Sequence, residues 1–206
     1  MRNTNTEIIG SNALSYGEYF NLVVKLAESQ KTTGEEQSTE KVSATKLNAQ
    51  RMKRLTKQIK LEDQLVKKIN GVKSFWNWTV LVEAWCGDAA QNVPYLAAMA
   101  SQNKNIDLKI ILRDENLEII DAHQTNGSRS IPILICTNKN TGKEIGSWGP
   151  RPSRIALKIR KFKISYPEIS HDEFVKNIHL WYAQDKGESI QEDFSKLIST
   201  WENTLT

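Results

Sequence analysis

The spacing of apolar residues along this chain predicts both helices and strands. Apolar side chains recur every three or four residues, as in amphipathic helices, in residues 16–28, 45–69, 88–101, 114–123, 153–164, 171–182 and 188–201. Short apolar runs, typical of buried strands, occupy residues 79–82, 106–112, 133–137 and 143–148. The predicted strands are confined to the middle of the chain, with helices on both sides of them.

The N-terminal part is predicted to be helical with a polar interruption. Ser15 and Glu18 have the spacing of a capping box, in which each side chain accepts the other residue's backbone N–H, so the first helix begins near residue 16. Residues 29–45 are polar, with one valine and no aromatic residue. That composition is typical of a mobile linker or long loop. The second helix follows over residues 45–69.

The second predicted helix combines an apolar seam with a basic remainder. The seam residues fall at steps of three, four and seven: Met52, Leu55, Ile59, Val66 and Ile69. We expect the seam to pack on the core, with a short coiled-coil dimer as the alternative. Nine Lys or Arg residues lie between Lys41 and Asn70, against two acidic ones. Because no aromatic residue interleaves them, we expect a solvent-exposed face and no nucleic-acid partner.

Composition is typical of a soluble globular protein. The chain has 206 residues, 39% of them hydrophobic, a formal net charge of +4 and a mean hydropathy of −0.51. No stretch is long and apolar enough to cross a membrane, and the first residues lack the apolar core of a signal peptide. The expected compartment is therefore the reducing cytoplasm, which suits free thiols.

Cys86 lies at a corner of the predicted structure where chemistry is expected. It stands between the strand over residues 79–82 and the helix over residues 88–101. The free N–H groups and the dipole at a helix N-terminus stabilise a thiolate. The alternative is that Cys86 only fills a turn, because a free cysteine packs like a small apolar side chain.

The residues around Cys86 resemble a known active site. Residues 85–87, Trp-Cys-Gly, are similar to the start of the thioredoxin motif W-C-G-P-C, and Pro94 stands where thioredoxins carry a helix proline. Residues 128–136 resemble the thioredoxin cis-proline loop and the strand after it, and residues 145–149 resemble the last strand with its glycine. More narrowly, the chain resembles single-cysteine thioredoxin-like proteins that carry W-C-G-D-A and W-G-P-R-P.

This resemblance implies an α/β, thioredoxin-like fold, a central mixed β-sheet flanked by helices. The thioredoxin-like domain would cover residues 72–165. Residues 1–71 would then be an added N-terminal helical extension with a polar linker near residues 29–45, and residues 166–206 an added C-terminal helical extension.

The same resemblance assigns substrate-binding roles around the cysteine. The Ile131–Pro132 bond would be cis, and the Ile131 backbone would face the cysteine and pair with an extended substrate segment. Gly149 would lie beside that proline, Trp148 would wall the groove, and Arg151 would place a cation at its rim. Alternatively, Trp148 lies in the core of a stiff turn. The expected substrate-binding residues are Trp85, Gly87, Ile131, Pro132, Trp148, Gly149 and Arg151.

Three departures from the thioredoxin motif bear on catalysis. Ala89 replaces the second cysteine, so the motif cannot close an internal disulfide. Asp88 replaces the proline and opposes a nearby thiolate by charge repulsion. The buried acid of thioredoxins would fall at Val80, and the nearest acid is instead Glu83, a candidate proton shuttle. The expected catalytic residues are therefore Cys86, Glu83 and Asp88, with a moderately acidic thiol.

Cys136, the other cysteine, is expected to be an inert core residue. It lies four residues along the strand from Pro132, about 13 Å at roughly 3.3 Å per residue, whereas a disulfide needs Cα atoms within about 7 Å. Any disulfide on Cys86 is therefore expected to be intermolecular. Two distant cysteines and scattered histidines give no metal-ligand spacing, so neither metal nor cofactor is expected.

Two functions remain open from the sequence. In the first, Cys86 is the nucleophile of a monothiol redox protein, and an external thiol resolves the mixed disulfide. Its partner would be a disulfide-containing or oxidised protein or a low-molecular-weight thiol. In the second, the chain is a catalytically inactive binding module that uses the groove of Trp85, Pro132 and Trp148 for a protein partner.

Overall fold

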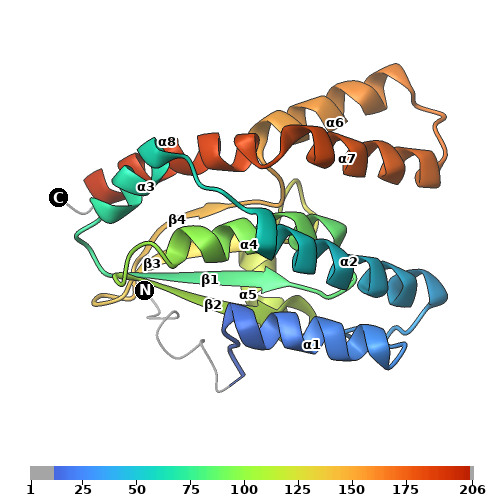
Figure 1. The fold of residues 1–206 in the computed structure, drawn as a ribbon, viewed down its shortest axis with the longest axis horizontal. Coiled ribbons are helices and arrows are strands. Elements are labelled where there is room, and N and C mark those ends of the chain that lie inside the picture. The colour runs from blue at the N-terminus through green and yellow to red at the C-terminus, as the bar shows by residue number, and fades with distance from the viewer. Residues whose placement is uncertain (1–11, 205–206) are drawn as a thin grey trace.

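Four strands form one mixed sheet in the computed structural model of the chain, which describes residues 12–204 (Figure 1). The strand order is β2–β1–β3–β4. β1 is parallel to β2 and antiparallel to β3, which is antiparallel to β4. The strands are β1 (Trp76–Val82), β2 (Ile106–Leu112), β3 (Ile133–Asn138) and β4 (Glu144–Trp148). This architecture confirms the predicted central mixed sheet.

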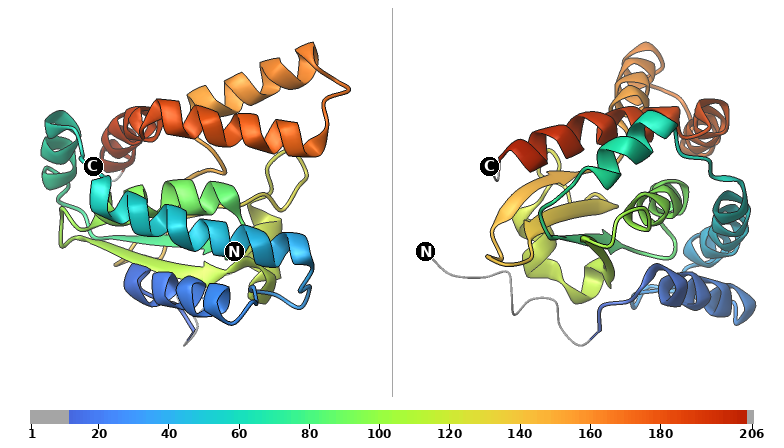
Figure 2. Two further views of the ribbon diagram at one scale, coloured as in Figure 1. Left: turned by 45° about the vertical axis from the view of Figure 1, so that its right-hand side comes forward. Right: turned by 60° about the vertical axis from the view of Figure 1, so that its left-hand side comes forward.

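Eight α-helices and one 3₁₀ turn surround the sheet within residues 12–204. They are α1 (Tyr16–Glu28), α2 (Thr39–Gln58), α3 (Asp63–Asn70), α4 (Gly87–Ala100), η1 (Arg113–Glu115), α5 (Leu117–Ala122), α6 (Ser153–Ser165), α7 (His171–Asp185) and α8 (Glu188–Asn203). Figures 1 and 2 show α3, α4 and α8 on one side of the sheet and α1 and α5 on the other. None of the helices in the described part of the chain has the length and hydropathy of a membrane span.

The C-terminal helix α8 is part of the core. Phe194 and Trp201 pack their rings against Trp78 of β1, with centroids 5.2 and 6.3 Å away. Gly146 of β4 leaves room for the Trp201 indole, since a Cβ at that position would lie 2.4 Å from its Nε1 atom. Aromatic pairs of this kind add to the free energy gained by burial. The sequence predicted α8 but gave no partner for Trp201.

The N-terminal segment differs in two ways from the prediction. The capping box of Ser15 and Glu18 is present, and α1 begins at Tyr16. However, α2 begins at Thr39, within the predicted linker over residues 29–45, because its first turn is polar and gives no apolar periodicity. The second difference is that the loop before α2 is held against the rest of the protein, since Thr33 is buried.

The predicted helix over residues 45–69 is two helices, since α2 ends at Gln58 and α3 begins at Asp63. Met52 is buried and Leu55 and Ile59 pack against the core, which confirms that part of the seam. After the break, Leu65 and Ile69 are the buried residues of α3. The prediction placed Val66 in the seam because it continued the spacing of α2 through residues 59–62, where the helix is in fact interrupted.

Candidate functional site

Cys86 is the N-cap residue of α4. Its backbone N–H donates to the Glu83 carbonyl oxygen at 3.0 Å, which forms the turn between β1 and the helix. Its Sγ atom accepts the Ala89 N–H at 3.4 Å and donates its own proton to the Ile131 carbonyl oxygen at 3.2 Å. The side chain is 7% exposed. Cys86 therefore lies at the strand-to-helix corner that the sequence indicated.

The loop before β3 and the end of β4 meet at this corner. The Ile131–Pro132 peptide bond is cis. Gly149 lies directly against it with a φ of +133°, and a Cβ there would be 2.2 Å from the Pro132 carbonyl oxygen. A residue other than glycine would be excluded by both its backbone conformation and the contact. The structure thus brings Cys86, Ile131, Pro132 and Gly149 together.

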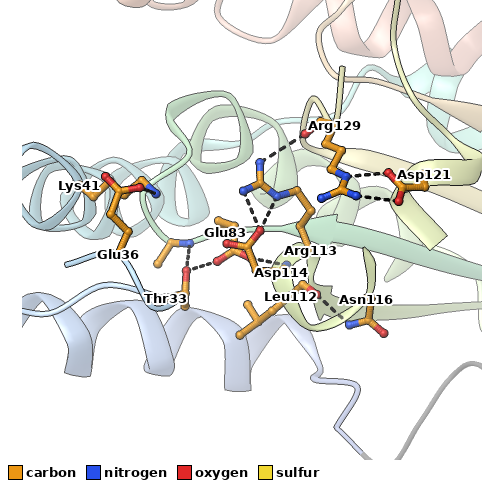
Figure 3. A network of polar contacts seen from close by, with 11 residues as sticks. Thr33, Glu36, Lys41, Glu83, Leu112, Arg113, Asp114, Asn116, Asp121 and Arg129 are labelled. Atoms are coloured by element: carbon orange, nitrogen blue, oxygen red, sulfur yellow. Dashed lines mark hydrogen bonds and ion pairs between the residues drawn. The ribbon is translucent and has the colours of Figure 1, made fainter. Parts of the chain in front are cut away.

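Glu83 is fixed in a network on one side of the corner (Figure 3). Its fully buried carboxylate accepts the Thr33 hydroxyl and the Asp114 N–H, the latter at 2.9 Å. Burial raises its pKa above the ordinary value, although the two hydrogen bonds act in the opposite direction. Both of its carboxylate oxygens are directed to these donors. Within residues 12–204 the carboxylate makes no hydrogen bond to the thiol, so the structure gives no direct support to the expected proton shuttle.

Asp88 is fixed in a second network on the other side of the corner. Its carboxylate forms an ion pair with Arg151 at 2.6 Å and accepts the Tyr182 hydroxyl at 2.9 Å. The Asn92 side chain donates both to the Asp88 carbonyl oxygen and to the Tyr182 hydroxyl oxygen. This network connects the active-site helix α4 to the loop after β4 and to α7.

The Cys86 thiol is less acidic than the sequence suggested. Burial, and after it the Asp88 carboxylate, raise the pKa of the thiol to about 12. The N–H groups at the start of α4 and the Arg151 guanidinium lower the pKa, but by less. The expectation of a moderately acidic thiol is therefore wrong for this conformation, because the helix terminus does not offset desolvation. The thiol is protonated at neutral pH.

A cleft of about 780 Å³ lies over Cys86, between α2 and α7. Trp85, Gly87 and Arg151 line it together with Arg51 of α2 and His179 of α7. Burial and the neighbouring Arg51 lower the pKa of His179 to about 4, so its imidazole is neutral at neutral pH. These residues come from distant parts of the chain, and the cleft is the space in which a ligand can approach the thiol.

The two tryptophans expected at the groove have different environments. Trp85 lines the cleft, and two cations lie over its ring, Lys41 at 4.6 Å and Arg113 at 5.0 Å from the ring centroid. Trp148 instead donates its Nε1 proton to Asp193 of α8 at 3.0 Å and is only 7% exposed. The structure places it outside the cleft over Cys86, in agreement with the alternative of a core position.

Several residues of the site were not identified from the sequence. Asn48 is buried and donates to the Ala84 carbonyl oxygen at 2.9 Å, which attaches α2 to the corner. Its spacing from Met52 and Leu55 places it on the apolar seam, and this was a signal that could have found it. Thr33, Arg51, His179 and Tyr182 had no comparable signal, because each reaches the site only through the folding of a distant segment.

Cys136 is buried in β3, opposite Trp78 of β1. Burial raises the pKa of its thiol above the ordinary value, and both cysteines are free thiols. No three side chains of the types His, Cys, Asp or Glu converge anywhere in residues 12–204. The groups that can contact the polar atoms of a ligand in the cleft are its polar and cationic side chains.

Comparison with known proteins assigns the fold. No curated protein matches the chain. Two solved structures each cover 90% of this chain and 98% of their own: an HIV epitope-scaffold, with 16% identity and a TM-score of 0.52, and a protein of unknown function from Pseudomonas aeruginosa, with 18% identity and a TM-score of 0.53. At these identities they support the fold alone. A family model described as thioredoxin matches residues 34–163, more than half of the chain, and the protein therefore belongs to the thioredoxin family.

Proposed function

We propose that this protein is a monothiol redox protein of the W-C-G-D-A type, with Cys86 as its nucleophile. The observation that carries the proposal is the position of the Cys86 sulfur, which accepts an N–H at the start of α4 beside the cis-proline and lies at the cleft. A sulfur in this position is available for thiol–disulfide exchange once it is deprotonated. Ala89 provides no second thiol, so resolution has to come from outside the motif.

The proposed reaction has two exchange steps. In the first, the Cys86 thiolate attacks one sulfur of a disulfide, forms a mixed disulfide, and releases the other sulfur as a thiolate that takes up a proton. In the second, the thiolate of an external thiol attacks the substrate sulfur of the mixed disulfide, forms a new disulfide with it and releases the Cys86 thiolate; away from Cys86, a second external thiol then attacks that disulfide, releases the substrate sulfur as a thiol and leaves the two external thiols joined as a disulfide. The external thiols supply the two electrons that reduce the substrate disulfide. We propose the reducing cytoplasm as the compartment, since it holds such thiols.

The environment of Cys86 determines how readily the first step begins. The Ala89 N–H and the Arg151 charge favour the thiolate, whereas burial and Asp88 favour the thiol. Because the pKa is about 12, we expect slow exchange at neutral pH and a rate that rises with pH. Glu83 is assigned a structural role, since both of its oxygens accept other donors. Asp88 is assigned control of the thiol pKa.

A turnover assay tests the proposed function. Bis(2-hydroxyethyl) disulfide would be supplied with increasing concentrations of glutathione, and its reduction followed in the presence and absence of the protein. We expect a protein-dependent rate that rises with thiol concentration, that Cys86→Ser abolishes and that Cys136→Ser leaves nearly unchanged. Absence of turnover at every thiol concentration and at every pH up to 9 would contradict redox catalysis.

One observation favours a second candidate function, a binding module without turnover. In this structure the Cys86 proton is donated to the Ile131 carbonyl oxygen, and the thiol pKa is about 12, which suits a structural thiol. A binding module should retain its protein partner when Cys86 is replaced by serine, which preserves a hydrogen-bond donor. Under the redox proposal, the same substitution should abolish covalent capture of a substrate.

A further inference from the structure

Arg51 is a partly buried cation of α2. It projects from α2 into the cleft, and its Nη1 atom donates to the Asn48 side-chain oxygen at 2.9 Å. It forms no ion pair with a carboxylate elsewhere in residues 12–204. A guanidinium has five N–H donors and is shaped to bind a carboxylate through two of them. Most of these donors therefore remain available to a ligand in the cleft.

Arg51 and His179 converge on Gly87, the residue next to the nucleophile. A Cβ on Gly87 would lie 3.7 Å from Nη1 of Arg51 and 3.4 Å from Nε2 of His179. The Nδ1 atom of His179 is buried and has no hydrogen-bond partner within the described residues. Because the imidazole is neutral, it adds a polar group beside the guanidinium without adding a second charge.

The carboxylates near Arg51 do not neutralise it. Asp88, the acid beside the thiol, favours the Arg51 charge electrostatically, but its ion pair and hydrogen bond are made with Arg151 and Tyr182. Glu40 and Asp172 also line the cleft, but both are exposed. Of the two lysines that line the cleft, Lys176 of α7 is exposed and Lys41 of α2 forms an ion pair with Glu36. Arg51 is therefore a partly buried charge near the sulfur that forms no ion pair with any described residue, and it is suited to bind a ligand with a negative group.

The rest of the cleft suits a small organic ligand rather than a bare ion. Ala44 and Leu47 of α2 and Val175 and Ile178 of α7 give it apolar walls. Its volume of about 780 Å³ falls in the range of roughly 300–1,000 Å³ that is usual for small-molecule sites. Apolar walls together with one unpaired cation are suited to a short aliphatic chain that ends in a carboxylate.

We infer that the cleft binds a low-molecular-weight thiol or disulfide that carries a carboxylate, and that Arg51 binds this carboxylate while the ligand's sulfur lies near Cys86. The inference rests on the proposed function for the role of the sulfur. The carboxylate site itself rests on Arg51 and the cleft. Arg51 is thus assigned as a specificity-determining residue that distinguishes anionic from neutral thiols.

A binding experiment that needs no redox chemistry tests this inference. The probes are 3-(methylthio)propionate and its neutral counterpart 3-(methylthio)propan-1-ol, which have the same chain and an unreactive sulfur. Their dissociation constants would be measured by NMR titration of the full-length Cys86→Ser protein. We expect the carboxylate to bind at least about tenfold more tightly, since charge-assisted hydrogen bonds are worth that much or more. In Cys86→Ser/Arg51→Met this preference should disappear.

Two further variants make the result decisive. Lys53→Met, added to Cys86→Ser, removes an exposed positive charge from the same helix and should leave the preference unchanged. Arg51→Lys keeps the charge but loses the planar fork, and should give an intermediate preference. Thermal unfolding of each variant would establish that α2 is intact.

Equal binding of both probes by Cys86→Ser, or a preference that persists in a folded Arg51→Met variant, would overturn the inference. Carboxylate binding without turnover in wild type would leave the inference standing and contradict only the redox proposal.

Discussion

The two sides of the Cys86 corner each carry an acid, and the structure uses the two acids differently. Glu83 is fully buried and accepts hydrogen bonds from the loop before α2 and from η1, which follows β2. Asp88 lies at the cleft, paired with Arg151 and bonded to Tyr182 of α7. Among the influences on the thiol pKa, burial is the largest and the Asp88 carboxylate is the second.

The difference shows that nearness in sequence does not determine which acid acts on the thiol. Glu83 is three residues before Cys86 and Asp88 two residues after it. The Glu83 carboxylate accepts hydrogen bonds from the Thr33 hydroxyl and the Asp114 N–H. Leaving donors without an acceptor away from water costs free energy of folding. Asp88 faces the cleft, where its charge acts on the sulfur. We therefore expect Glu83 to determine stability and Asp88 to determine reactivity.

The largest expected effect is the loss of stability on replacing Glu83. Glu83→Ala would leave the buried Thr33 hydroxyl and the partly buried Asp114 N–H without an acceptor, and should lower the free energy of unfolding by about 3 kcal/mol. Asp88→Ala should cost less than half of that, because water in the cleft can replace the lost acceptor. Chemical denaturation of the two variants measures the difference. A smaller loss for Glu83→Ala than for Asp88→Ala would reverse the comparison.

The second effect concerns the reactivity of the thiol. Wild-type alkylation by iodoacetamide should increase about tenfold per pH unit between pH 7 and 9, because the thiolate reacts and both values lie below the pKa of about 12. Asp88→Asn removes the repelling charge and frees Arg151 to favour the thiolate. The thiol pKa should fall by about one unit, which increases the rate at pH 8 about tenfold.

Glu83→Gln is the matched control for that measurement. It is an equally conservative change at the other acid, and should leave the pH profile of alkylation nearly unchanged, provided that the variant is folded. A profile that shifts with Glu83→Gln but not with Asp88→Asn would show that Glu83 acts on the thiol after all, as the sequence suggested.

The smallest effect is the response of α7 to acid. The pKa of His179 is lowered from 6.5 to about 4, so the unfolded chain takes up this proton at a higher pH than the folded one. The stability that depends on a neutral His179 is therefore complete above pH 6.5 and is lost as the pH falls towards 4. NMR titration of the imidazole should show a midpoint near 4, and His179→Asn should remove this part of the acid sensitivity. A midpoint near 6.5 would place His179 in solvent, away from Arg51.

Periodicity predicted most of the fold because its signal is local. The apolar run at residues 106–112 coincides with β2, and the helix predicted from residue 88 differs from α4 by one residue at each end. The start of α2 at Thr39 was missed because its first turn carries no apolar pattern. The break between α2 and α3 was missed because residues 59–62 include neither glycine nor proline.

The candidate site was only partly predictable for a different reason. The motif around Cys86, together with Pro132 and Gly149, lies in segments whose order along the chain carries the thioredoxin resemblance. The contact between Asp88 and Tyr182 joins residues 94 positions apart, and a single sequence gives no signal for such a pair. The thiol pKa depends on burial by these distant segments, so it could not be judged from the helix N-terminus alone.

The most direct test of the account is the mass of the protein after one exchange step. Wild-type protein would be incubated at pH 9 with a small excess of bis(2-hydroxyethyl) disulfide, without thiol, and analysed by intact-mass and peptide-mass spectrometry. A monothiol mechanism at Cys86 predicts one stable mixed disulfide on Cys86 and none on Cys136, since Ala89 cannot resolve it and Cys136 is buried at a distance. Adding glutathione should remove the adduct and restore the free thiol. An internal Cys86–Cys136 disulfide, an adduct on Cys136, or an unmodified Cys86 would contradict a monothiol mechanism at this site.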